Sequence, residues 1–167
     1  MNVLRSVLIN WILPVALVLG VLTGVQWLNE PEVQLGASGE APVFEAKDTE
    51  GQALVLTDFR GQKVLLNFWE SWCGPCKAEI PGINRVARKN PELVVLGLAS
   101  ESGDLAALAR AKEELGIEFR VVRSDSKIRS QYGVRKVPTT FLIDEEGRVT
   151  KSHVGVITPV TLAAWLR

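Results

Sequence analysis

The chain has 167 residues, of which 47% are apolar, so it can bury one core of ordinary domain size. Its 19 basic and 19 acidic side chains give a formal net charge of zero, which excludes the basic excess that a nucleic-acid partner requires. The 2 cysteines are too few for a disulfide-stapled scaffold, so sulfur chemistry is confined to one pair.

An uncharged, mostly apolar segment runs from Val7 to Leu28. At about 1.5 Å per residue it is long enough to cross a hydrocarbon core of about 30 Å, so it predicts one transmembrane helix. Arg5 precedes the segment, whereas Glu30 and Glu32 follow it, and this bias places the rest of the chain outside the cytoplasm. A cleaved signal peptide is the alternative, and it predicts the same compartment.

Composition divides the chain into three regions. Residues 1–28 form the N-terminal anchor, residues 29–40 form a tether of small and polar residues, and residues 41–167 form the folded domain. The anchor predicts that the protein contacts the membrane through residues 7–28.

The first half of the domain predicts a hairpin followed by a strand and a helix. Strands at 43–46 and 53–56 flank a turn in which Gly51 can take a positive φ. Residues 63–69 are almost continuously apolar, as expected of a strand buried on both faces, and residues 74–89 carry a helical pattern. A buried strand therefore leads into a helix.

The second half continues the alternation of helices and strands. Its expected elements are strand 93–99, helix 104–115, strand 118–122, helix 126–132, strands 139–143 and 148–154, and a final helix beginning at Pro159. A βαβ crossover is followed by a hairpin and a helix, so the fold class is α/β, with a mixed central sheet flanked by helices.

The two cysteines form a C-x-x-C motif, Cys73-Gly74-Pro75-Cys76, at the junction between the predicted strand and helix. The amides and the dipole at a helix N-terminus lower the pKa of a thiol from ~8.5 into the range ~3.5–7.5. Cys73 is therefore the expected nucleophile, and Cys76, one turn into the helix, the resolving thiol.

Three other interpretations of the cysteine pair are weaker. A structural disulfide gains little stability from closing so short a loop. A zinc site would need two more Cys or His ligands, and the chain offers only His153. A buried pair without a role would not be expected at this spacing and position. We therefore expect no metal and no cofactor other than the redox-active disulfide Cys73–Cys76.

Two longer motifs carry a resemblance to a known family. Asn67–Pro81 (NFWESWCGPCKAEIP) and Val137–Asp144 (VPTTFLID) resemble the TlpA/ResA group of thioredoxin-like proteins, as do Ala41–Phe44 and Leu56–Gly61. The resemblance covers the chain from about Ala41 to the C-terminus. It implies a thioredoxin-like fold with an N-terminal hairpin and a central βαβ insertion, anchored in the bacterial inner (cytoplasmic) membrane by a single pass and facing the periplasm.

The resemblance also implies roles for residues around the dithiol. Cys73 is the nucleophile, Cys76 the resolving thiol, and Glu79 matches a position where members carry a glutamate that can exchange protons with the dithiol. The alternative for Glu79 is a solvated carboxylate on the helix surface. Asn67 stands where thioredoxin has a buried aspartate, and an amide cannot act as a general base. Glu70 replaces a residue that is usually small, and it either tunes a pKa or faces water.

A substrate-contacting surface is implied as well. Pro138 matches the cis-proline that faces the cysteines, and the backbone of Val137 is expected to pair with a substrate strand. Trp72, Gly74 and Pro75 are assigned to the same surface.

The leading hypothesis for function is a protein-disulfide oxidoreductase that reduces disulfides in exported proteins. Gly-Pro between the cysteines resembles the reducing, thioredoxin end of a scale from roughly −270 to −120 mV. The expected partners are protein dithiol or disulfide substrates, among them apocytochrome c, and a transmembrane thiol reductant resembling DsbD or CcdA. The alternatives are an oxidase or isomerase of the copper-sensitivity-suppressor type, a non-catalytic Cu(I)-binding module, and a peroxidase.

Overall fold

The computed structural model describes residues 12–28, 39–100 and 104–167. The chain divides into two compact units, Met1–Glu30 and Pro31–Arg167. In the first unit, helix α2 spans Leu13–Leu28. Within the described ranges, no helix combines the length and apolar character needed to cross a membrane. Residues 7–11 of the predicted anchor and residues 29–38 of the predicted tether lie outside those ranges.

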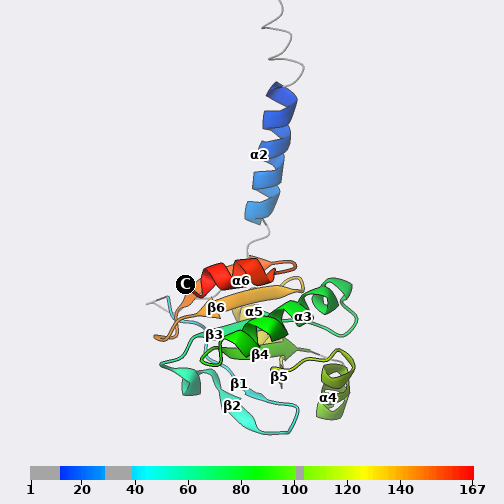
Figure 1. Ribbon diagram of the computed structural model, residues 1–167, viewed down its shortest axis with the longest axis vertical. Helices are drawn as coiled ribbons and strands as arrows, with labels where there is room; N and C mark the ends of the chain where they lie inside the picture. The colour runs from blue at the N-terminus through cyan, green and yellow to red at the C-terminus, as the bar shows by residue number, and fades with distance from the viewer. Residues whose placement is uncertain (1–11, 29–38, 101–103) are drawn as a thin grey trace, which may run out of the picture. The chain divides into compact units, whose positions relative to one another are not determined.

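The second unit is built on a five-stranded sheet in the order β5-β4-β3-β6-β7 (Figure 1). Its strands are β3 (Val64–Phe68), β4 (Val94–Ala99), β5 (Arg120–Arg123), β6 (Thr139–Ile143) and β7 (Val149–Val154). β3, β4 and β5 run parallel, whereas β6 is antiparallel to both β3 and β7, so the predicted mixed sheet is confirmed. Every residue of the central strand β3 is buried, as its almost continuously apolar sequence predicts, and its one polar residue, Asn67, is buried as well.

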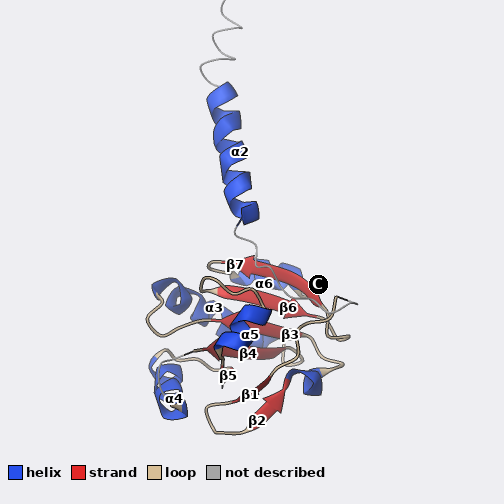
Figure 2. Ribbon diagram, turned by 180° about the vertical axis from the view of Figure 1, so that it is seen from behind, coloured by secondary structure: helices blue, strands red, loops and turns tan. Residues whose placement is uncertain are grey.

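Helices cover both faces of the sheet. On one face, α3 (Gly74–Lys89), α4 (Leu105–Glu114) and α6 (Pro159–Trp165) contribute to a core that contains both cysteines. On the other face, α5 (Ser126–Gln131) contributes to a second core, which contains Phe68 and Phe141. Figure 1 looks onto the face covered by α3, and Figure 2 shows α5 in front of the sheet from behind. The sheet therefore separates two apolar layers, and the dithiol belongs to the α3 layer.

The predicted N-terminal hairpin is confirmed. Strands β1 (Glu45–Lys47) and β2 (Ala53–Val55) pair antiparallel, and Gly51 in their turn has a φ of 81°. The first strand begins and ends later than the predicted range 43–46. The second strand is shorter than predicted, because Leu56 begins a 3-10 helix, η2 (Leu56–Phe59). Ala46, Leu54 and Leu56 pack into the core on the α5 side of the sheet.

Candidate active site

The loop between β3 and α3 places Cys73 at the N-cap of the helix. The main-chain N–H of Cys73 donates to the Glu70 carbonyl at 3.1 Å, which tightens the loop. Pro75 lies in the first turn of α3, where its fixed φ suits the helix and its missing N–H is not needed. The main-chain N–H of Cys76 donates to the Sγ atom of Cys73 at 3.2 Å. The sulfur of Cys73 therefore sits among the amides that a helix N-terminus leaves without intrahelical partners.

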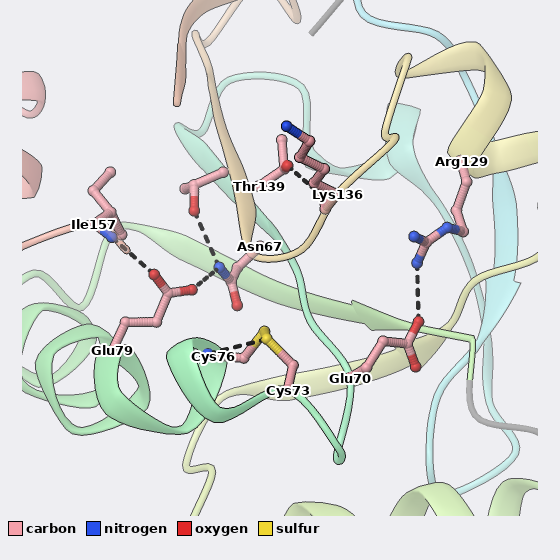
Figure 3. The surroundings of a disulfide bond; sticks show 10 residues. Asn67, Glu70, Cys73, Cys76, Glu79, Arg129, Lys136, Thr139 and Ile157 are labelled. Carbon is pink, nitrogen blue, oxygen red and sulfur yellow. Dashed lines mark hydrogen bonds and ion pairs between the residues drawn. A yellow bond between two sulfur atoms is a disulfide. The ribbon is translucent and has the colours of Figure 1, made fainter. Parts of the chain in front are cut away.

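Cys73 and Cys76 are joined by a disulfide, with an S–S distance of 2.09 Å and a Cα–Cα distance of 5.3 Å (Figure 3). Cys76 is fully buried and Cys73 is 4% exposed, so Cys76 is the less accessible of the two. After reduction, the positive end of α3 favours a thiolate on Cys73. In the parts of the chain that the structure describes, no group of three or more His, Cys, Asp or Glu side chains could hold a metal ion.

The proline expected beside the cysteines adopts the predicted geometry, since the Val137–Pro138 peptide bond is cis. Pro138 directly precedes β6, whose first residue, Thr139, pairs with Phe68 at the end of β3. The main-chain N–H of Gly155 donates to the Pro138 carbonyl at 2.8 Å. The cis bond therefore lies at the end of the sheet from which the active-site loop leaves.

The surface around this loop is accessible. Trp72 is 75% exposed, and Gly74 and Pro75 are also exposed. Val137 is half-buried and packs against the core that contains both cysteines. Pro138 is buried, so the other four residues assigned from sequence to substrate contact supply the accessible surface near this end of β3.

Glu79 lies on the side of α3 that faces the sheet, and it is only 3% exposed. Its Oε1 atom accepts a hydrogen bond from Asn67 Nδ2 at 2.7 Å, and its Oε2 atom accepts one from the main-chain N–H of Ile157 at 2.8 Å (Figure 3). The alternative of a solvated surface carboxylate is therefore wrong. Because Cys76 and Glu79 are three residues apart on α3, they share one side of the helix.

Burial raises the pKa of Glu79 from 4.5 to about 7, although the hydrogen bonds from Ile157 and Asn67 act in the opposite direction. A carboxyl group with such a pKa changes its protonation state near neutral pH. It can therefore both accept and return a proton under the conditions in which thiols react.

The raised pKa of Glu79 predicts that the stability of the oxidised protein depends on pH. Between pH 4.5 and about 7, the folded protein keeps a proton on Glu79 that the unfolded chain has released. The free energy of unfolding therefore falls as the pH rises, by about 3 kcal/mol over this interval at about 1.4 kcal/mol per pKa unit. Urea denaturation at several pH values should show this fall in the wild type and its loss in Glu79→Gln. An equal fall in both proteins would assign the effect to other groups.

Glu70, three residues before Cys73, is buried and does not face water. Its Oε1 atom accepts hydrogen bonds from the main-chain N–H of Ser100 at 3.1 Å, from the Ser100 hydroxyl at 2.5 Å and from Arg129 Nη1 at 2.9 Å. Figure 3 shows Arg129 reaching toward this carboxylate from α5. The side chain thus ties the active-site loop to the residue after β4 and to a helix that covers the opposite face of the sheet.

Replacing Arg129 with methionine is expected to destabilise the fold, because it leaves the Glu70 carboxylate buried without its cation. Breaking a fully buried ion pair costs about 3–5 kcal/mol. Since 22% of the Arg129 side chain is exposed, we expect about 1–3 kcal/mol in denaturant unfolding. Arg88→Met, which breaks the exposed Arg88–Glu118 pair, is the matched control, with an expected change below about 1 kcal/mol. Equal effects of the two substitutions would contradict a structural role for the buried pair.

Several contributors to the site carry no signal in a local motif. Ser100 and Arg129 reach Glu70 from positions 30 and 59 residues away, and Ile157 reaches Glu79 from 78 residues away. Thr140 lies within the VPTTFLID motif, and its hydroxyl accepts a hydrogen bond from Asn67 Nδ2 at 3.0 Å. Of these four residues, only Thr140 could be found from a motif.

A redox pair at the N-terminus of a helix, following the central strand of a mixed sheet and accompanied by a cis-proline, defines a thioredoxin-fold thiol–disulfide oxidoreductase. Comparison with known proteins leads to the same class. Residues 37–152 match the AhpC/TSA family. Thiol-disulfide oxidoreductase ResA of Bacillus thuringiensis (strain Al Hakam) is 34% identical over 142 residues, which cover 83% of this chain and 80% of that protein.

Solved structures show the same fold. A putative thiol:disulfide interchange protein DsbE from Chlorobium tepidum aligns with a TM-score of 0.68 and 30% identity, over 76% of this chain and 91% of that one. StoA from Bacillus subtilis aligns with a TM-score of 0.65 and 27% identity, over 75% of this chain and 97% of that one. The chain therefore belongs to the ResA-like thiol–disulfide oxidoreductases of the AhpC/TSA family.

Proposed function

We propose that this protein reduces disulfide bonds in exported proteins, using the Cys73–Cys76 dithiol outside the cytoplasm. The observation that carries the proposal is the redox pair at the N-terminus of α3 with Gly74 and Pro75 between its cysteines. This Gly-Pro pair resembles that of thioredoxin, whose potential of about −270 mV lies at the reducing end of the known range.

The reaction proceeds by two thiolate attacks. The Cys73 thiolate attacks one sulfur of the substrate disulfide, so a mixed disulfide forms and the other substrate sulfur leaves as a thiolate. Cys76 then loses its proton and attacks Cys73 Sγ, which forms the Cys73–Cys76 disulfide and releases the second substrate thiolate. The substrate gains two electrons and the protein loses two. A membrane thiol reductant of the DsbD or CcdA kind returns them by the same exchange.

Glu79 accepts the proton that Cys76 loses in the second attack. Its carboxylate lies one helical turn from Cys76 on the same side of α3, and its pKa of about 7 suits proton transfer at neutral pH. During reduction of the protein by its electron donor, Glu79 returns this proton to Cys76.

The substrate chain lies across Trp72 and the backbone of Val137. The exposed indole supplies an apolar contact beside Cys73, and an extended substrate segment pairs with the main chain before cis-Pro138. Recognition of this kind relies on main-chain contacts, and it suits unfolded exported chains such as apocytochrome c.

The domain is held at the periplasmic face of the inner membrane by residues 7–28. The uncharged apolar segment and the order of flanking charges, Arg5 before it and Glu30 after it, support this placement. The full chain should stay in the membrane fraction after alkaline extraction, and its domain should be digested by protease added to spheroplasts. Release of a shortened soluble form would instead indicate a cleaved signal peptide.

The redox potential of the full chain tests the direction of the reaction. We would equilibrate the protein in thiol buffers and measure the fraction of Cys73–Cys76 disulfide. A potential near that of thioredoxin, about −270 mV, is expected for a reductase. A value near about −120 mV, as in DsbA, would contradict the proposal and favour oxidation or isomerisation.

A further inference from the structure

Asn67 occupies the centre of the sheet, directly under the active-site helix. It lies one residue before the end of β3, opposite Gly97 of β4 and Thr140 of β6, and it is completely buried. Its neighbours at alternate positions, Leu65 and Trp69, pack into the core that contains both cysteines. Because side chains alternate along a strand, Asn67 points to that same face, toward α3.

Among the described residues, the side-chain amide of Asn67 makes hydrogen bonds only through its nitrogen. Nδ2 donates to Glu79 Oε1 at 2.7 Å and to the Thr140 hydroxyl at 3.0 Å, which occupies both of its hydrogens. The Oδ1 atom is buried, and none of the described residues donates a hydrogen bond to it. An ionised carboxylate only accepts hydrogen bonds, so the nitrogen end must face Glu79 and the oxygen end must face away. Leaving a buried acceptor without a donor is unfavourable.

The unused oxygen lies on the side of the redox pair. Cys76 and Glu79 are three residues apart on α3 and share one side of the helix. Glu79 binds Asn67, and Cys76 packs into the same core as Leu65 and Trp69, the neighbours of Asn67 on that face. In Figure 3, the nitrogen of Asn67 points to Glu79, and the oxygen points toward the disulfide. In the disulfide form Cys76 carries no proton. Reduction gives its sulfur an S–H group, which is a hydrogen-bond donor.

We propose that in the reduced protein the thiol of Cys76 donates a hydrogen bond to Asn67 Oδ1, so that Asn67 links the resolving cysteine to Glu79. This inference rests on the proposed dithiol chemistry, and it makes Asn67 a positioning residue. Before the resolving step its oxygen end holds the Cys76 thiol, and its nitrogen end holds the Glu79 carboxylate. A hydrogen bond donated by the thiol also favours the protonated form of Cys76, which leaves Cys73 as the thiolate that meets the substrate.

The cysteine content of the chain allows a direct test. Because there are only 2 cysteines, Cys73→Ala in the full chain leaves Cys76 as the single S–H oscillator. Alanine is preferred to serine, because a serine hydroxyl at position 73 would itself accept from the Cys76 thiol. The S–H stretching band in the infrared spectrum should lie below that of a free alkyl thiol in an apolar solvent. Adding Asn67→Leu should move it upward to the free position, and the thiolate fraction of Cys76 at a given pH should rise.

Two further variants keep the test decisive. In the Cys73→Ala background, Asn67→Asp retains an oxygen acceptor, so its band should stay at or below that of the Cys73→Ala parent even if Asn67→Leu does not fold. Thr140→Val removes the other partner of Asn67 Nδ2 and leaves Oδ1 in place, so its band should stay near that of the Cys73→Ala parent. A band at the free position in the Cys73→Ala protein, or one that Asn67→Leu leaves unchanged, would overturn the proposal. The band does not depend on turnover, so failure of the proposed reductase activity would be seen separately.

Discussion

Cys73→Ser is expected to abolish disulfide exchange, whereas Cys76→Ser is expected to stop it after the first attack. Serine at position 73 supplies no thiolate, so no mixed disulfide forms and the rate falls to that of the uncatalysed reaction. With serine at position 76 the first attack proceeds, but no second thiol releases the substrate. Incubation with a disulfide-bonded peptide, followed by mass spectrometry of the intact protein, should show one covalently bound peptide per Cys76→Ser chain.

The two variants test whether each cysteine is required and also which of them attacks the substrate. A peptide trapped on Cys73→Ser, with none on Cys76→Ser, would reverse the assignment of nucleophile and resolving thiol. The structure favours Cys73 as the nucleophile, because its sulfur accepts a hydrogen bond from a main-chain N–H at the start of α3, while Cys76 has no exposed surface. Treatment of the trapped adduct with dithiothreitol should release the peptide, which confirms a disulfide linkage.

Glu79→Gln is expected to slow the second attack by about 10²–10⁴-fold, the usual contribution of a positioned general base. Glutamine is nearly the same size and can still bind Asn67, but it takes no proton at neutral pH. In the wild type, the rate of peptide release should rise with pH through about 7, as the Glu79 carboxyl loses its proton and becomes a base. In Glu79→Gln this rise should disappear. Stopped-flow measurement of peptide release after mixing reduced protein with substrate separates this step from the first.

Glu113→Gln is the matched control for this experiment, since Glu113 is an exposed carboxylate on α4. It should retain the wild-type rate and pH profile. A rise through about pH 7 that persists in Glu79→Gln would assign the titration to another group, such as the cysteines themselves.

Local signals predict the elements around the redox pair well. The bounds of α3 and β6 match the predicted ranges 74–89 and 139–143. Helix α3 begins where Pro75 and the N-cap Cys73 dictate, and both are visible in sequence. The strand predicted at 118–122 instead spans Arg120–Arg123. The apolar residue Phe119 fits the strand pattern in sequence, so the prediction begins too early. Pairing with β4, which sequence does not reveal, decides where that strand begins.

Some features of the candidate site are predictable from sequence and others are not. The redox pair and the cis-proline are predictable, because each belongs to a contiguous motif. The burial of Glu70 is not, because a carboxylate in a loop is expected to be exposed unless its partners are known. Those partners, Ser100 and Arg129, are distant in sequence and meet Glu70 only when the sheet has formed. A distant donor also decides the burial of Glu79, whose partner Ile157 follows the last strand.

The bond from Ile157 to Glu79 has a consequence for how this site can be studied by mutagenesis. Its donor is a main-chain N–H, so every residue except proline at position 157 can supply it. Alanine scanning would therefore pass over the contribution that the C-terminal segment makes to the acidity of Glu79. Ile157→Pro, or an ester in place of the amide, would remove the N–H donor. The effect of the hydrogen bond on the pKa of Glu79 could then be measured. The C-terminal segment contributes to the site through the position of its main chain. This contribution does not depend on which side chains the segment carries.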